Sequence, residues 1–98
     1  MSRYSLDLLP EAEAEIREAF LWYFERSPMA ARAFRAEVFA AMDALSDQAH
    51  IWAPNEDGIR KYILSHFPYT VYYELSEQRV VVFAVGHQRR KPGYWELR

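Results

Sequence analysis

The side chains with the richest chemistry lie together near the end of the sequence. One stretch carries an imidazole, an amide, two guanidinium groups, a phenol and an indole: His87, Gln88, Arg89, Arg90, Tyr94 and Trp95. Metal-free RNA cleavage needs a base for the 2′-hydroxyl, an acid for the leaving oxygen and cations for the phosphate. His87, Tyr94 and Arg60 have the chemistry for these roles. The same cations are also typical of an ordinary strand and a solvated tail, so the residues alone leave catalysis open.

Other kinds of catalytic or metal site lack the residues that they need. The chain has no cysteine and only three glycines, which excludes thiolate chemistry and a glycine-rich phosphate loop. His50, His66 and His87 have no second histidine or carboxylate at a spacing typical of metal ligands. No serine lies in a glycine-flanked nucleophile elbow. We therefore expect neither a metal nor a cofactor.

Length and charge limit the choice of partner further. The 98 residues, of which 51% are hydrophobic, are enough for one small domain spanning residues 1–98. Residues 1–58 carry five Lys or Arg against eleven Asp or Glu, whereas residues 59–98 carry seven against three. A net charge of −2 argues against sequence-specific nucleic-acid binding as the main activity. No signal peptide or membrane-spanning stretch is visible, so we expect a cytoplasmic protein without a membrane partner.

Two amphipathic helices are predicted after a short first strand. Residues 3–8 alternate polar and apolar side chains, as a half-buried strand does. Pro10 begins a helix in which Glu11, Glu13 and Glu15 fall in the opening turns, and we expect a strongly acidic outer face. Ser27 and Pro28 then mark the start of a second helix that runs to about Ala49. The short break predicts an antiparallel helical hairpin.

Three strands are predicted in the second half of the chain. Residues 59–64, 69–75 and 80–85 read as strands with short links, which predicts an antiparallel meander. The unbroken apolar run 80–85 favours a central strand covered on both faces. The predicted fold is therefore α+β, with the order β-α-α-β-β-β and an antiparallel sheet that carries the N-terminal helical hairpin on one face.

Five segments in this order resemble the RelE/ParE superfamily of type II toxin–antitoxin systems, specifically its ParE-like (plasmid stabilisation) branch. Residues 9–16 are similar to the start of that family's first helix, and residues 23–28 to its inter-helix turn. Residues 59–62 and 67–73 resemble its second and third strands, and residues 86–95 resemble its ending. The similarity spans nearly the whole chain.

The resemblance implies a toxin that is neutralised by a cognate antitoxin in a hetero-oligomer. ParE-like toxins inhibit DNA gyrase by binding it, whereas RelE-like toxins cut mRNA in the ribosome. The gyrase alternative predicts target contacts at the stretch described first, with Arg89, Arg90, Tyr94 and Trp95 as its tip. A ribosome-dependent endoribonuclease using His87, Tyr94 and Arg60, and a non-toxic interaction module of the same fold, remain the two alternatives.

Antitoxin contacts are expected on the helical hairpin, where the family's antitoxin segment lies. Leu21, Trp22 and Phe39 fall off the main apolar stripes, which indicates either a wide stripe or a surface that covers a partner. The predicted contact residues are Phe20, Trp22, Tyr23 and Phe39. For Tyr94 and Trp95, two outcomes are open: the rings fold back on the core, or they anchor an interface.

Overall fold

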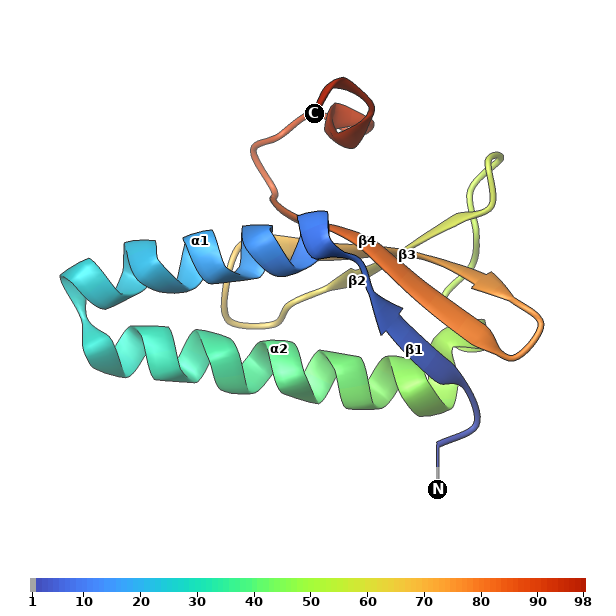
Figure 1. Cartoon of the computed structure of the whole chain (residues 1–98), viewed down its shortest axis with the longest axis horizontal. Coiled ribbons are helices and arrows are strands. Elements are labelled where there is room, and N and C mark those ends of the chain that lie inside the picture. Colours follow the sequence, from blue (N-terminus) through green and yellow to red (C-terminus); the bar gives the residue numbers. More distant parts are fainter. Residues whose placement is uncertain (1) are drawn as a thin grey trace.

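The computed structural model describes residues 2–98 and has the predicted α+β fold (Figure 1). The elements, in chain order, are β1 (Ser5–Leu8), α1 (Pro10–Arg26), α2 (Pro28–Gln48), the 3₁₀ turn η1 (Ala49–Ile51), β2 (Ile59–Ile63), β3 (Tyr69–Ser76), β4 (Arg79–His87) and the 3₁₀ turn η2 (Tyr94–Leu97). The predicted order β-α-α-β-β-β is confirmed, with boundaries shifted by one or two residues.

The break between the helices has the predicted chemistry. The Ser27 side chain accepts a hydrogen bond from the Ala30 N–H at 3.2 Å, and Pro28 occupies the first turn of α2. The Ser27 N–H donates to the Tyr23 carbonyl at 2.7 Å, which closes the end of α1. Because the break is one residue long, α1 and α2 run side by side (Figure 1). Neither helix within residues 2–98 is both long and apolar enough to span a membrane.

The sheet has the strand order β1-β4-β3-β2 and is mixed. Strands β2, β3 and β4 form the predicted antiparallel meander. Strand β1 pairs with β4 in parallel, with Ser5 opposite Arg79 and Leu8 opposite Val82, so one of the three strand pairs departs from a purely antiparallel sheet. The short links of the meander fix its antiparallel directions, but β1 meets its partner only after the helical hairpin has crossed over the sheet.

Hydrophobic side chains cover both faces of β4, as predicted. The main core lies between the helices and one sheet face, and its fully buried members include Phe34 and Tyr73. A second cluster on the other face contains Tyr72, Phe83 and Ala84, with Trp95 packed against it. A β-bulge opposite Tyr72 and Tyr73 inserts one extra residue into β4. This extra residue reverses the alternation of side chains along the strand.

Candidate functional site

A loop of polar and cationic residues follows directly on the central strand. Its members, which we call the basic loop, are Gln88, Arg89, Arg90 and Lys91, and all four are exposed. Backbone hydrogen bonds fix its start: the Gln88 N–H donates to the Pro68 carbonyl at 2.8 Å, and the Arg90 N–H donates to the His87 carbonyl at 2.9 Å. The cations are therefore presented by an ordered turn at the end of a buried strand.

His87 supports this turn and is only partly exposed. Its Nδ1 accepts a hydrogen bond from the Arg89 N–H at 3.0 Å, and its ring packs edge-on against Tyr69 with 5.2 Å between centroids. A neutral imidazole whose Nδ1 accepts must carry its proton on Nε2. The imidazole of His87 therefore stabilises the turn that carries the basic loop.

Tyr94 and Trp95 fold back onto the sheet. The Trp95 ring lies 4.5 Å from Tyr72 and 5.2 Å from Phe83, centroid to centroid. The Tyr94 hydroxyl donates to Glu15 Oε2 at 2.8 Å. Burial, and then the hydrogen bond and charge of Glu15, raise the pKa of the Tyr94 phenol well above its ordinary value. The rings of Tyr94 and Trp95 thus pack on the hydrophobic core, the first of the two predicted outcomes. Each residue nevertheless remains partly exposed.

The structure therefore divides the predicted target-binding residues into two groups. Gln88, Arg89 and Arg90 are exposed, whereas His87, Tyr94 and Trp95 are partly buried and brace the segment that carries them. The Arg90 guanidinium lies over the Tyr94 ring at 4.7 Å from its centroid, a cation–π contact that joins the groups.

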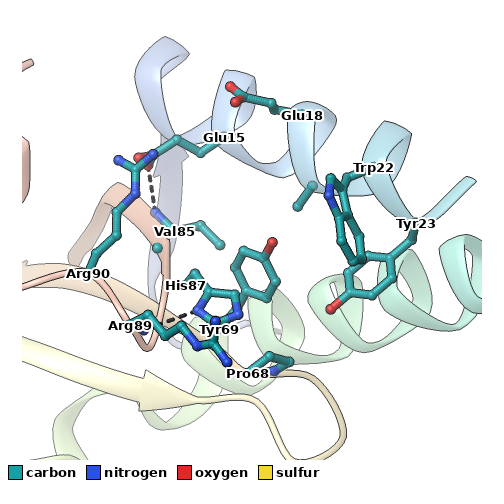
Figure 2. Close-up of a pocket in the computed structure, with 12 residues that line it drawn as sticks. Glu15, Glu18, Trp22, Tyr23, Pro68, Tyr69, Val85, His87, Arg89 and Arg90 are labelled. Atoms are coloured by element: carbon teal, nitrogen blue, oxygen red, sulfur yellow. Dashed lines mark hydrogen bonds between the residues drawn. The ribbon is translucent and has the colours of Figure 1, made fainter. Parts of the chain in front are cut away.

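A groove of about 570 Å³ lies between α1 and the end of β4. Figure 2 shows Trp22 and Tyr23 at one end, Glu18 on the α1 wall, and Arg89 and Arg90 on the side of the basic loop. Its lining also includes Tyr69, whose pKa is raised by burial and the neighbouring Tyr23. Aromatic faces beside guanidinium groups are suited to recognising a partner's side chains.

The residues of the catalytic alternative are not brought together. Arg60 lies opposite Tyr73 on β3, whereas His87 lies opposite Tyr69. Four residues of strand separate these positions by about 13 Å. The Arg60 Nη1 donates to the carbonyls of Trp52 at 2.6 Å and His50 at 3.2 Å, so it fixes the loop before β2 instead of a substrate.

The predicted antitoxin-contact residues also differ in exposure. Trp22 and Phe39 are 51% and 55% exposed, respectively. Phe20 and Tyr23 are partly buried, and Tyr23 contributes its ring to the main core. Leu21, which also falls off the apolar stripes, is exposed, and so are Phe24 and Met29, for which we predicted no antitoxin contact.

Glu15 lies at this site, although its place in the sequence predicted a solvent-facing position. We expected it on the acidic outer face of α1, but its side chain is only 17% exposed and turns toward β4. Its spacing could have predicted this burial. Glu15 lies three residues after Ala12 and four before Ala19, so it shares a helix face with these two buried alanines.

The other two histidines belong to local structure. His50 Nδ1 lies 2.8 Å from the Tyr4 hydroxyl, and His66 pairs with Glu37 at 3.0 Å. Within residues 2–98, no group of three or more imidazole and carboxylate side chains could hold a metal ion.

Comparison with known proteins identifies the family. A family model described as "ParE toxin of type II toxin-antitoxin system, parDE" matches residues 6–92. No curated protein matches the chain. A solved structure described as "Chromosomal ParDE TA system from P. aeruginosa" has a TM-score of 0.76 at 17% identity, covering 87% of this chain and 96% of that one. At this identity the structural similarity shows the fold alone, whereas the family model covers most of the sequence and confirms the predicted resemblance. The chain therefore belongs to the ParE toxin family of type II toxin–antitoxin systems.

Proposed function

We propose that this ParE-family chain inhibits DNA gyrase by binding it through the basic loop, and that a cognate antitoxin neutralises the toxin. The family supports the role of toxin. The observation that carries the choice of mechanism is the arrangement at the end of β4, where Arg89 and Arg90 are exposed on an ordered turn. A preorganised cationic tip loses little conformational entropy when it binds, which favours recognition.

The same arrangement speaks against cleavage of RNA. The Tyr94 phenol is held by Glu15, and its raised pKa disfavours ionisation. Arg60 lies about 13 Å from the position of His87, measured along the strand direction. The three residues of the catalytic alternative, His87, Tyr94 and Arg60, therefore do not converge on one point.

The antitoxin is proposed to cover the helical hairpin. Leu21, Trp22 and Phe39 are each about half exposed, and Met29 is 78% exposed. Large apolar side chains gathered on one pair of helices are typical of a protein–protein contact, because water solvates them poorly. Trp22 also lines the groove that leads to the basic loop, so an antitoxin on the hairpin would reach the proposed target-binding end.

Inhibition of purified gyrase tests the proposal. The unaltered chain is expected to block DNA supercoiling, and Arg90→Ala is expected to weaken the block at least tenfold while its circular dichroism and unfolding midpoint stay unchanged. Arg32→Ala is the matched control because Arg32 is an exposed arginine on α2, away from the basic loop. Equal inhibition by the Arg90→Ala variant and the unaltered chain would refute the role of the loop.

Expression in cells separates the alternatives. Gyrase inhibition predicts filamentous growth and DNA-damage signalling before protein synthesis declines. An early collapse of translation that His87→Ala abolishes would favour the ribosome-dependent endoribonuclease. Unaffected growth, with binding to the antitoxin retained, would favour the non-toxic interaction module.

A further inference from the structure

The Glu15 carboxylate gathers three hydrogen-bond donors from two distant parts of the chain. Oε1 accepts from the Val85 N–H at 2.8 Å and forms an ion pair with Arg98 Nη1 at 2.7 Å, and Oε2 accepts from the Tyr94 hydroxyl at 2.8 Å. A carboxylate with two oxygens and several charge-assisted partners is held firmly in one position. Figure 2 shows Glu15 reaching from α1 to the Val85 amide on β4.

These contacts occupy a strand edge that would otherwise lack partners. Strand β1 pairs with β4 only as far as Val82. Beyond that point the Phe83 carbonyl accepts from Arg98 Nη2, and the Val85 N–H donates to Glu15. Because backbone groups left unpaired in a protein interior are costly, the two side chains complete the strand where the neighbouring strand stops.

A second observation indicates that the segment 94–98 is fitted to this place. A Cβ added to Gly86 would lie 2.5 Å from the Tyr94 hydroxyl oxygen and 2.6 Å from its ring, so Tyr94 lies directly against a backbone position without a side chain. The Arg90 guanidinium lies over the same ring, 4.7 Å from its centroid. The path from Glu15 to the exposed cation thus passes through a single aromatic side chain.

We propose that Glu15 is a positioning residue for the basic loop: by fastening Tyr94 and Arg98 to the edge of β4, it sets where Arg90 is presented. The consequence rests on the proposed function. Loss of the contacts of Glu15 with Tyr94 and Arg98 should weaken gyrase inhibition, although no residue that contacts gyrase is removed. Glu15 itself is largely buried and acts through Tyr94 and Arg98.

The test uses Glu15→Gln with Glu13→Gln as the matched control. Glu13 lies on the same helix, loses the same charge, and is 63% exposed in a surface pair with Arg17. Nuclear magnetic resonance reports the placement directly, because the Arg90 side-chain protons are shifted by the Tyr94 ring current. Amide exchange at Val85 reports the fastening, and the amide of Leu45 in the main core is the reference for global stability.

We expect Glu15→Gln to remove the Arg90 ring-current shift and to accelerate exchange at Val85, while exchange at Leu45 is unchanged. Gyrase inhibition should weaken about tenfold, which corresponds to one lost charge-assisted hydrogen bond. Glu13→Gln should change none of these values. Where Glu15→Gln does not fold, Tyr94→Phe removes one hydroxyl group and should produce the same changes at smaller amplitude.

Two results would overturn the proposal. One is an Arg90 shift that Glu15→Gln and Tyr94→Phe leave intact, and the other is a lost shift with undiminished inhibition. If the unaltered chain fails to inhibit gyrase, the proposed function fails, whereas the Arg90 shift and the Val85 exchange still decide whether Glu15 places the loop.

Discussion

Replacing Gly86 with alanine is the sharpest test of how the end of the chain packs. Gly86 lies in β4 beneath the Tyr94 ring, and an added Cβ would meet three atoms of that side chain between 2.5 and 2.8 Å. Ordinary carbon contacts lie at about 3.5–4.0 Å. The ring must therefore move by roughly 1 Å, which disturbs its contacts with Glu15 and Arg90.

Whether Gly86→Ala stabilises or destabilises the chain, and by how much, depends on the presence of the Tyr94 ring. Forcing a methyl group into a packed site costs about 1–3 kcal/mol. Without the ring, alanine would stabilise the strand by about 0.5–1 kcal/mol, because glycine loses more backbone entropy on folding. Gly86→Ala should thus destabilise the unaltered chain and stabilise a Tyr94→Ala background. The coupling between the two positions should be about 1.5–4 kcal/mol.

Urea unfolding of the four proteins in this double-mutant cycle measures the coupling. The fluorescence of Trp95, measured with Trp22 and Trp52 replaced by phenylalanine in all four proteins, provides a local check, because its indole packs on Tyr72 and Phe83 and should become more exposed when the segment shifts. Tyr94→Ala alone supplies the reference for the lost ring. An equal free-energy change for Gly86→Ala in both backgrounds would refute the close approach of Tyr94 to β4.

Two further predictions concern stability and pH. Burial raises the pKa of Tyr73 to about 12 from 10.0, so the native chain keeps this proton while the unfolded chain loses it. The stabilisation from Tyr73 is therefore complete below pH 10 and declines toward pH 12. Tyr73→Phe leaves the Ala49 carbonyl without its hydrogen-bond partner and should lower the free energy of unfolding by about 1–3 kcal/mol at pH 8, measured by urea unfolding. The difference between the two proteins should shrink by pH 11. A difference that stays constant with pH would contradict the raised pKa of Tyr73. For Glu37, partial burial works to raise the pKa, but hydrogen bonds from His66 and the Ser65 N–H outweigh it and lower the pKa below 4.5. Its contribution is then present above pH 4.5 and lost as the pH falls, so unfolding free energies of the unaltered chain and Glu37→Gln should differ at pH 7 and converge at pH 3.

The candidate site could be predicted only in part, and the reason lies in its connections. The exposed cations were visible because they follow a buried apolar run. The contacts of Glu15 were not visible, since its partners Val85, Tyr94 and Arg98 lie 70 to 83 residues further along the chain. The carbonyl partners of Arg60 were not visible for the same reason, because they become apparent only when the loop before β2 is folded.

The fold class was determined by local patterns that are already present in the sequence. Ser27 and Pro28 end one helix and begin the next, and the short links between the three apolar segments of the second half predict a meander. Such signals depend only on residues that are close together in the chain, so the sequence alone is enough to predict these elements.

The tertiary structure alone decided the pairing of β1 with β4 and the two faces of the central strand. Val80–Val85 is apolar throughout, so the sequence could not say which residues face the helices. The bulge near Phe83 places Val82 and Val85 in the main core and leaves Phe83 and Ala84 on the face that Trp95 covers. The physical reason is that register and strand order depend on hydrogen bonds between distant segments, which exist only after the chain has closed on itself.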